Sequence, residues 1–442
     1  MPISAKGTVL EVLNDHDYVL RQIEERDIHF IRLWFTDALG NLKSLAVTDS
    51  EIESALEQGM GFDASSIAGF CDEVDSHMLA FPIASSFQVL PWRPKDNGVA
   101  RMFCDVRTPD GMPCAGDPRN VLKRAVERAR GLGFSFNVGP ELEFYYSRGK
   151  EAFEPLDNAG YFDLTTDDHA SDLRRDTILT LEKMSIPVEY SHHESSPSQQ
   201  EIDLRYADAI SVADAIMTYR LVVKEVALAH GVYATFMPKP AIDLHGSGMH
   251  LHQSLFDEEG TNVFHDPSGL NLSATAKSYI AGLLAYAPAY CAITNQHVNS
   301  YKRLAAPDAP NRICWSHASS RSIVRVPAYR PEDENATRVE LSVPDAAANP
   351  YLALSVTLAA GLQGIEEGLT LGDPLQGSDV CEAECMPPTL SHALDRLEDS
   401  SLMKEVLGDR LHAYLLEYGR RECTLFNRDV SAWETERYFS RL

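Results

Sequence analysis

Three segments of this chain each place two ionisable side chains at positions i and i+2: Glu141 and Glu143, His250 and His252, and Arg338 and Glu340. In a β-strand this spacing points both side chains to the same face, because side chains alternate along a strand. The residues between and after them, such as Leu142, Phe144 and Leu251, are apolar. We therefore expect a sheet with one apolar face and one face lined by carboxylates, imidazoles and guanidinium groups. That combination suits divalent cations that bridge phosphates.

Bulk composition narrows the class of protein. The chain has 442 residues, of which 44% are hydrophobic and 24% charged, as in ordinary globular proteins. Its formal net charge of −26 argues against a nucleic-acid or anionic-membrane partner, since both are polyanions. We find no apolar run of about 18 residues and no basic leader followed by an apolar stretch. Eight cysteines without a CxxC pair indicate free thiols, so we expect a cytoplasmic protein.

The chain is expected to divide into a small domain, residues 1–107, and a larger domain, residues 108–442. A helix at 15–26 is followed by alternating residues that turn near residues 37–41, which is typical of a hairpin. Turn residues at 109–118 mark the boundary, and Asp117 followed by Pro118 is a typical helix start.

The larger domain mixes strands and helices in irregular order, so the expected fold class is α+β. Strands are expected at 134–146, 187–191, 200–205, 232–237, 247–256 and 337–343. Helices are expected at 171–184, 208–230, 272–291 and 349–366, with two or three more within 388–440.

Further carboxylates lie in residues 192–201, where a His-His-Glu run is followed by a bend and a second glutamate. Taken alone, this segment could be a solvated loop, and an isolated Glu-x-Glu could lie on an edge strand facing water. The bend, however, would let Glu194 and Glu201 approach the same cavity. Oxygen-rich ligand sets of this kind favour Mg²⁺ or Mn²⁺ over zinc.

Arginines are crowded into one part of this acidic chain: Arg303, Arg312, Arg321, Arg325, Arg330 and Arg338. About half are expected to be ordinary surface residues. The others would neutralise a phosphoryl group in transfer or bind a substrate carboxylate. Metal ligands and arginines on a polar sheet indicate phosphoryl transfer from a nucleotide. The chain has neither a GxxxxGK[ST] loop nor a GxGxxG turn after a strand, which excludes a P-loop site and argues against a Rossmann site.

At this point the motifs resemble a known family, the type I bacterial glutamine synthetases, over essentially the whole length. The matching segments are residues 62–70, 140–144, 192–194 with the downstream Glu201, 235–240, 246–254, 299–304, 338–340 and 344–352. The resemblance implies a small β-grasp domain followed by a catalytic domain with a polar-lined antiparallel sheet. It also implies a dodecamer of two stacked hexameric rings with sites at subunit interfaces, where Asp63 and Ser66 would come from the neighbouring subunit.

The resemblance further implies a role for each matched residue. About two or three Mg²⁺ or Mn²⁺ ions would be bound, and the implied metal ligands are Glu141, Glu143, Glu194, Glu201, His250 and Glu340. The implied ATP-binding residues are Tyr206, His252, Ser254, Arg325 and Arg338. The implied residues for the amino-acid substrate are Ser66, His245, Gly246, Arg303 and Arg321. The implied catalytic residues are Asp63, Asp308, Arg325 and Arg338.

The reaction implied by the resemblance forms an amide from glutamate and ammonia or an amine. ATP would phosphorylate the side-chain carboxylate, and the acyl phosphate would then react with the amine, whose proton passes to an acidic residue. Members of the γ-glutamylpolyamine synthetase branch share a segment similar to residues 32–44. A polyamine or another small amine is therefore an alternative acceptor.

Departures from the family pattern fall among the substrate contacts. His245 stands where the family usually has asparagine, and Asp308 is the nearest acid to the usual flap glutamate. Ser342 replaces a usual arginine, which removes a charge-assisted contact of about 2 kcal/mol. Residues 372–390 contain no tyrosine, so we do not expect regulation by adenylylation.

Three alternatives remain open at this stage. The chain could be a ligase for an acid other than glutamate, a phosphotransferase of the guanidino-kinase type, or a non-catalytic regulatory relative. Retention of every implied metal ligand, together with varied substrate contacts, favours a working ligase with a changed substrate.

Overall fold

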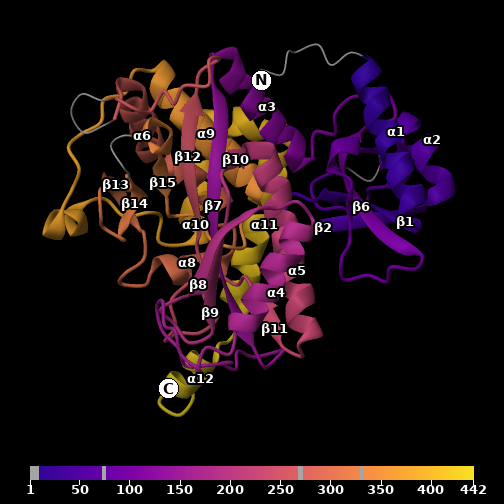
Figure 1. Ribbon diagram of the computed structural model, residues 1–442. Coiled ribbons are helices and arrows are strands. Elements are labelled where there is room, and N and C mark those ends of the chain that lie inside the picture. Colours follow the sequence, from indigo (N-terminus) through magenta and orange to yellow (C-terminus); the bar gives the residue numbers. More distant parts are fainter. Residues whose placement is uncertain (1–8, 72–75, 267–271, 329–332) are drawn as a thin grey trace.

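The chain folds around two sheets in the computed structural model, which describes residues 9–71, 76–266, 272–328 and 333–442. Figure 1 shows the smaller body, in indigo and violet, beside the larger one, with helix α12 at the lower end of the larger body. The α+β class expected from the sequence is confirmed. Of the arginines expected at the site, Arg330 lies outside the described residues.

The smaller body contains a sheet of six strands in the order β2-β1-β6-β4-β3, with β5 paired to β6. Its elements are α1 (Val9–Glu25), β1 (Ile28–Thr36), β2 (Leu42–Thr48), α2 (Ile52–Gln58), β3 (Met60–Asp63), β4 (His77–Pro82), β5 (Gln88–Val89) and β6 (Gly98–Arg107). Strands β1 and β6 run parallel, whereas the other pairs are antiparallel. Alternate residues such as Ile31, Leu33 and Met102 are buried and form its core with α1 and α2.

The larger body contains a sheet of nine strands in the order β13-β14-β15-β12-β7-β9-β8, with β10 and β11 also paired to β7. These strands are β7 (Ser135–Ser147), β8 (Val188–His193), β9 (Gln199–Leu204), β10 (Ala207–Asp208), β11 (Tyr233–Thr235), β12 (Met249–Phe256), β13 (Arg312–Ser316), β14 (Ser322–Arg325) and β15 (Val339–Leu341). All pairs are antiparallel except β13 with β14.

Helices cover the apolar side of this sheet, as Figure 1 shows for α3, α5, α9 and α11. Their bounds are α3 (Pro118–Gly131), α4 (Ser171–Lys183), α5 (Ala209–Ala229), α6 (Ala274–Ala285), α7 (Ala287–Thr294), α8 (Val298–Leu304), α9 (Pro350–Glu366), α10 (Leu390–Glu398), α11 (Ser401–Arg428) and α12 (Ala432–Tyr438). Asp117 caps α3 as expected, its side chain accepting from the Arg119 amide, and Pro118 follows it in the first turn.

The helix expected at 272–291 is two helices, because α6 ends at Ala285 and α7 begins at Ala287. Pro288 lies in the first turn of α7, where the missing amide hydrogen does no harm, although it would interrupt a continuous helix. Strands β13 and β14 were not expected from the sequence. The C-terminal segment forms three helices, and α11 is kinked at Gly408, which has a φ of 78°.

The side chains of strand β7 show which face of the large sheet is polar and which is apolar. Its residues alternate between buried and partly buried positions, and Val138, Leu142 and Phe144 are fully buried against the helices. Helices α3 and α5 pack on this side. The intervening residues, including Glu141 and Glu143, therefore lie on the other face.

Polar contacts join the two bodies. Asn349 caps α9 and also donates from Nδ2 to the backbone carbonyls of Asp37 (3.1 Å) and Ala38 (3.3 Å). Arg119 joins Asp105 of β6 (2.8 Å) to Asp214 of α5 (3.0 Å). The division at residues 107 and 108 stays a prediction, and it falls between the end of β6 and the start of α3.

We expect Gly364→Ala to destabilise the protein, because α6 and α9 cross in close contact there. A Cβ at Gly364 would lie 2.2 Å from the Ser278 carbonyl oxygen and 2.7 Å from the Gly282 Cα. The helices would have to separate, at a cost of about 1–3 kcal/mol. Gly131→Ala is the matched control, because no atom lies within 4 Å of its added Cβ, and it should gain about 0.5–1 kcal/mol. Urea denaturation compares the two, and equal midpoints would contradict this packing.

Candidate functional site

The register of six neighbouring strands aligns ionisable side chains across the large sheet. The paired positions are Arg325 with Glu340, Glu340 with His252, His250 with Glu141, Glu141 with Asp203, Glu143 with Glu201, and Glu201 with His192. Paired residues on adjacent strands project to the same face of a sheet. The three i, i+2 segments seen in the sequence therefore lie side by side, in one polar row.

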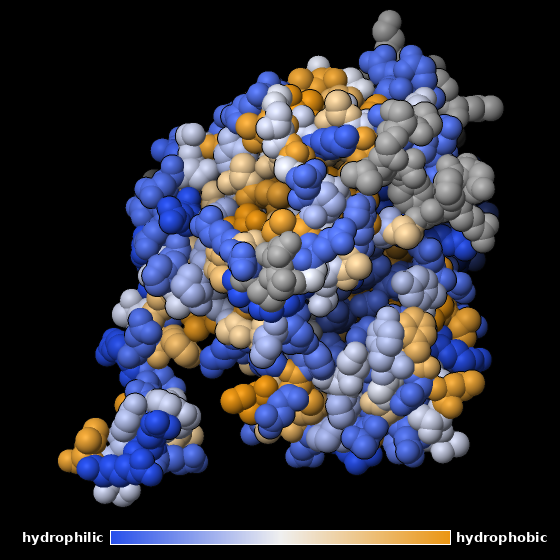
Figure 2. Space-filling view, turned by 90° about the vertical axis from the view of Figure 1, so that its left-hand side faces the viewer, coloured by the Kyte–Doolittle hydropathy of each residue, from blue (hydrophilic) through white to orange (hydrophobic). Residues whose placement is uncertain are grey.

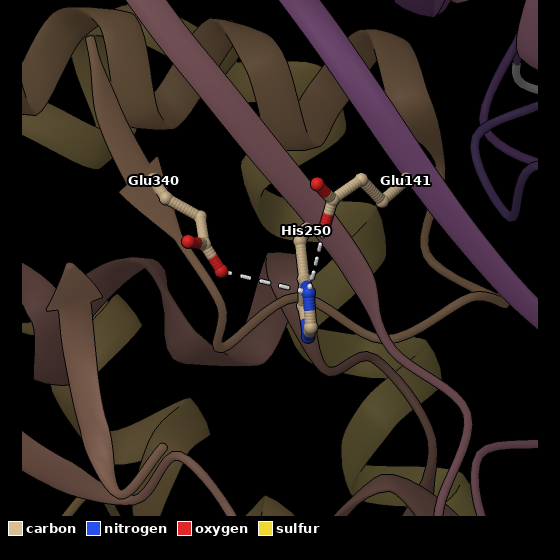
Figure 3. Close-up of side chains that lie close together, drawn as sticks. All are labelled: Glu141, His250 and Glu340. Carbon is tan, nitrogen blue, oxygen red and sulfur yellow. Dashed lines mark hydrogen bonds and ion pairs between the residues drawn. The ribbon is translucent and has the colours of Figure 1, made fainter. Parts of the chain in front are cut away.

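The first group in this row consists of Glu141, His250 and Glu340, one residue from each of β7, β12 and β15. Figure 3 shows the two carboxylates on either side of the imidazole, to which both are joined by dashed lines. His250 Nδ1 lies 3.1 Å from Glu141 Oε2 and 3.6 Å from Glu340 Oε1. Their potential ligand atoms all lie within 4.8 Å of one another, which is close enough for one ion to contact all three.

Electrostatics keep the carboxylates of this first group charged. Burial alone would raise the pKa of Glu141, but the hydrogen bonds of His250 and His252 outweigh it and hold that pKa well below its usual range. Burial also opposes ionisation of Glu340, whose pKa is nevertheless lowered by the two histidines and by Arg325. The same contacts raise the pKa of His250 against the effect of its burial.

The second group consists of Glu194, Glu201 and His192, whose potential ligand atoms also lie within 4.8 Å of one another. His192 Nε2 is 3.1 Å from Glu201 Oε1, and its Nδ1 is 3.4 Å from Glu194 Oε1. Glu143 lies beside this group, where its Oε2 accepts from the Gly248 amide at 2.8 Å. It also lies between the two groups, with its Oε1 3.8 Å from His250 Nε2.

Negative charge accumulates around the second group. Burial and the charge of Glu143 raise the pKa of Glu194 to about 7. Burial, followed by Asp203 and Glu143, raises the pKa of Glu201 well above its usual value. Burial and the charge of Glu141 raise the pKa of Asp203 to about 8. Carboxyl groups that repel one another in this way fit a doubly charged cation, which would favour their ionised forms.

A buried ion pair holds the bend that carries Glu194. His193 Nε2 lies 3.0 Å from Asp157 Oδ1, and the same oxygen accepts from the Ser198 amide at 2.7 Å. The side chains of His193 and Asp157 are completely buried. Residues 194–198 reverse direction between β8 and β9 around this buried pair, which brings Glu194 back toward Glu201.

Two cavities open on the polar row. The first has a volume of about 320 Å³, and its lining includes Gly139, Glu141, Asp203, Tyr206, His252, Ser254 and Arg338. Arg338 donates from Nε to His252 Nδ1 (3.1 Å), while His252 Nε2 lies 2.6 Å from Glu141 Oε1. These hydrogen bonds fix the orientation of the His252 imidazole and place the Arg338 guanidinium at the wall of the cavity. Ser254 is buried and donates to the Thr337 carbonyl (2.9 Å).

The second cavity has a volume of about 160 Å³ and lies on the other side of the metal-capable groups. Its lining includes Glu143, Glu194, His245, Gly246, Arg303, Asp308, Arg325 and Ser342. At its mouth His245 Nδ1 lies 2.7 Å from Asp308 Oδ2, and both side chains are about half exposed. The His245 backbone is fixed by Tyr145, whose hydroxyl donates to its carbonyl at 2.7 Å.

Arg303 is buried in the wall of this second cavity with its terminal nitrogens on backbone groups. Its Nη1 donates to the Val343 carbonyl at 2.8 Å and its Nη2 to the Ser342 carbonyl at 3.1 Å. Gly246 packs against it so closely that an added Cβ would lie 2.4 Å from Arg303 Cγ. Ser342, which stands where the family pattern usually has an arginine, donates to Glu340 Oε1 at 3.0 Å.

Arg325 contacts the same carboxylate from the neighbouring strand. It donates from Nε to Glu340 Oε1 at 3.0 Å and makes a second, shorter contact from Nη2. Its charge therefore lies beside both the first group and the second cavity.

Five of the expected site residues do not line either cavity. Glu201 and Glu340 are buried within the polar row itself, whereas the other three lie outside it. Asp63 ends β3 in the smaller body, where the Ser65 amide and hydroxyl lower the pKa of its exposed carboxyl. Ser66 is exposed close by. Arg321 lies in the turn between β13 and β14, next to Ser320 of the second cavity.

His192 and Asp203 are members of the polar row that were not expected from the sequence. Asp203 is 3% exposed, lies opposite Glu141 and lines the first cavity. Its position two residues after Glu201 is the same i, i+2 signal that drew attention to the other strands. His192 could have been found from its place two residues before Glu194, in the same His-His-Glu run.

Comparison with known proteins agrees with this geometry. Residues 115–438 match the description "Glutamine synthetase, catalytic domain", and residues 27–109 match "Glutamine synthetase, beta-Grasp domain". The chain belongs to the glutamine synthetase family. It is accordingly a ligase that forms C–N bonds, and members of this family generally use ATP and divalent metals.

Relatives and solved structures cover almost the whole chain. A glutamine synthetase of Mycolicibacterium smegmatis is 48% identical over 441 residues, covering 96% of this chain and 99% of that protein. One of Methanosarcina mazei is 44% identical over 439 residues, covering 96% and 97%. A solved structure described as a GmaS/ADP complex has a TM-score of 0.88 at 31% identity and covers 96% of this chain and 99% of its own.

Figure 2 shows the face on the side of β13 and β14, where blue, hydrophilic residues predominate and orange ones gather in smaller patches. Within the described residues, no helix combines the length and the apolar character needed to cross a membrane.

We expect binding of Mg²⁺ or Mn²⁺ to release protons near neutral pH. The pKa values of about 7 for Glu194 and about 8 for Asp203 leave both carboxyls partly protonated at pH 7, whereas a bound cation favours the ionised forms. Since these folded-state pKa values are raised, the groups stabilise the metal-free fold at low pH. That contribution is lost as the pH rises through about 7 to 8.

Calorimetric titration at pH 7 in two buffers of different ionisation enthalpy measures this release. The apparent binding enthalpy should depend on the buffer, and the dependence should shrink at pH 9 and in the Glu194→Gln variant. A buffer-independent enthalpy at pH 7 would contradict the assignment of protonated carboxyls to this row.

Proposed function

We propose that this protein joins ammonia or a small amine to the side-chain carboxylate of glutamate, with ATP consumed through an acyl phosphate. The observation that carries the proposal is the polar row, in which two metal-capable groups lie between two cavities. One cavity would hold the nucleotide and the other the amino acid, so that the γ-phosphoryl group and the acid meet at the row. The family membership supports the same reaction class.

The ligand chemistry fits divalent cations. Glu141, His250 and Glu340 would hold one ion, and Glu143, Glu194 and Glu201 would hold another, with His192 beside the second set. A carboxylate-rich set with one imidazole suits Mg²⁺ or Mn²⁺. Bound there, these ions would supply positive charge that stabilises the phosphate oxygens during transfer.

We assign the nucleotide to the first cavity. Tyr206, His252, Ser254 and Arg338 line it, and Arg338 would face the phosphates at the row. Arg325 lies on the opposite side of Glu340 and would neutralise the charge of the transferring group. The solved structure described as a GmaS/ADP complex shares the fold at a TM-score of 0.88, which supports nucleotide binding by a protein of this fold.

We assign the amino acid to the second cavity, with Gly246 and His245 in its wall and Arg303 behind them. The terminal nitrogens of Arg303 already donate to two backbone carbonyls. Its positive charge would therefore attract the substrate carboxylate from within the cavity wall. Arg321 would contribute from the β13–β14 turn. Asp308, which is paired with His245 at the mouth of the cavity, would lie where the amine enters.

In the reaction the glutamate side-chain oxygen attacks the γ-phosphorus of ATP, and the bond from phosphorus to the bridging oxygen of ADP breaks. The amine nitrogen then attacks the carbonyl carbon of the acyl phosphate. The carbon–oxygen bond breaks and inorganic phosphate leaves, while a proton of the amine passes to a carboxylate. We assign that carboxylate to Asp63, whose lowered pKa keeps it ionised and able to attract an ammonium ion.

Asp63 and Ser66 lie apart from the cavities of their own chain, which supports a site completed by a neighbouring subunit. We therefore propose a homo-oligomer, a dodecamer of two hexameric rings, built from chains with a small domain at 1–107 and a catalytic domain at 108–442. As acceptor we favour ammonia, in line with the relatives described as glutamine synthetases. Small amines and polyamines form the alternative acceptor class, which the exposed His245 and Asp308 at the mouth could admit.

The proposal is tested by incubating the full-length protein with ATP, Mg²⁺, glutamate and either ammonium or a panel of amines. Phosphate release should require both the acid and the amine, and mass spectrometry should identify one γ-glutamyl amide. Glu141→Gln should lower kcat/KM by about 100-fold or more, because it weakens one ion site and the orientation of His252.

Glu182→Gln is the matched control, because Glu182 lies in α4 and is exposed away from the row. It should leave the rate unchanged. Failure of every acid and amine to stimulate phosphate release would refute the ligase function for this chain, and equal rates in the two variants would refute the placement of the site.

A further inference from the structure

Arg101 is a buried cation of the smaller body. It lies on β6, is 5% exposed, and packs its guanidinium 4.7 Å from the ring centre of Phe103 and 5.5 Å from that of Trp34. Its Nη1 donates to the Ser86 carbonyl, whereas its buried Nε has no hydrogen-bond partner. Among the described residues, no carboxylate forms an ion pair with it. A charge removed from water normally requires a counter-charge.

The neighbouring carboxylates are already paired with other cations. Asp214 accepts from Arg119 Nε and Nη2, both at 3.0 Å, and from the Tyr351 hydroxyl at 2.6 Å. Asp105 is paired with Arg119 at 2.8 Å and with Lys123 at 2.5 Å. The negative charges of Asp214 and Asp105 therefore compensate the positive charges of Arg119 and Lys123, and they do not compensate the charge of Arg101. Burial accordingly lowers the pKa of Arg101 to about 10, although Asp214 and Tyr351 oppose this effect.

A cavity of about 350 Å³ adjoins Arg101 at the junction of the two bodies. Ser85, Ser86 and Arg101 of the smaller body line one side, while Arg205 and Ser211 of the larger body line the other. Asp208, which caps α5, is the carboxylate of the lining that is not paired with Arg119. The lining thus combines hydroxyl donors with two arginines beyond Arg119, and its volume suits a small metabolite.

We propose that this cavity binds a small oxyanion, whose carboxylate, sulfate or phosphate group pairs with Arg101 between the two domains. The fork of a guanidinium matches the paired oxygens of such groups. Hydroxyls of Ser85 and Ser211 would complete the contacts from either side. The site is separate from both cavities of the polar row, although Leu204 lines it and the nucleotide cavity alike.

An anion bound there would contact both bodies at once. Anything that binds the folded protein and not the unfolded chain raises its stability by an amount that grows with the ligand concentration. The occupied site would therefore strengthen the docking of the smaller body, which carries Asp63, onto the larger one. This effect is independent of the ligase function, since it needs neither nucleotide nor metal.

Selenate is a suitable probe, because it is a small tetrahedral oxyanion that scatters anomalously. Thermal unfolding of the full-length protein in a metal-free buffer should show a Tm that rises with selenate concentration. Ser85→Trp, at an exposed position in the lining, should fill the cavity and reduce that rise to less than half. Ser44→Trp is the matched control at an exposed serine of the same body, and it should keep the full rise.

Arg101→Lys retains the charge but loses the fork, so about 10-fold more selenate should be needed for the same rise. Crystals soaked with selenate should show an anomalous peak within hydrogen-bond distance of the Arg101 guanidinium. An equal Tm rise in the Ser85→Trp and Ser44→Trp proteins, or anomalous peaks confined to the polar row beside Arg325 and Arg338, would overturn the proposal.

Discussion

The backbone register of β7 against β12 and β9 is the constraint on which the candidate site depends. Hydrogen bonding sets His250 opposite Glu141 on one side of β7 and Glu201 opposite Glu143 on the other. A slip of one residue in either ladder would turn the carboxylates into the helix-covered core and the apolar residues into the cavities. Burial of Leu142, Phe144 and Leu251 opposes such a slip. The packing that stabilises the sheet therefore also positions the chemistry.

The row is costly for the fold in the absence of a cation. Several carboxyls converge where burial already disfavours charge, and the pKa values of Glu194 and Asp203 rise to about 7 and 8. Histidines and Arg325 balance the first group, but the second has His192 alone beside its two glutamates. Such a group of carboxyls destabilises the fold when no cation is bound, and it is well suited to bind one. The same contrast between paired and unpaired charge distinguishes Arg119 from Arg101 at the domain junction.

Much of this site could be predicted from sequence because period-two spacing reports which side chains share a strand face. Glu141 with Glu143 and His250 with His252 were found in this way. What spacing cannot report is which strands are neighbours, since that depends on long-range pairing. Glu201 was placed by the bend after the His-His-Glu run and by the family resemblance, and Asp203 was overlooked although it follows the same spacing.

Local contacts made by side chains were also out of reach of the sequence. The pairing of His245 with Asp308 joins two loops far apart in the chain, and the bonds of Arg303 to backbone carbonyls depend on how α8 packs. The short strands β13 and β14 have few alternating residues, whereas the break between α6 and α7 could have been read from Pro288. Prediction was thus strong where local periodicity decides the structure and weak where tertiary packing does.

Anomalous diffraction from crystals of the full-length protein grown with Mn²⁺ and ADP tests the central claim most directly. The account predicts manganese within coordination distance of Glu141, His250 and Glu340, and a second peak beside Glu194 and Glu201, with ADP in the cavity lined by Tyr206. Manganese bound only elsewhere on the protein, with these side chains turned away from one another, would contradict it.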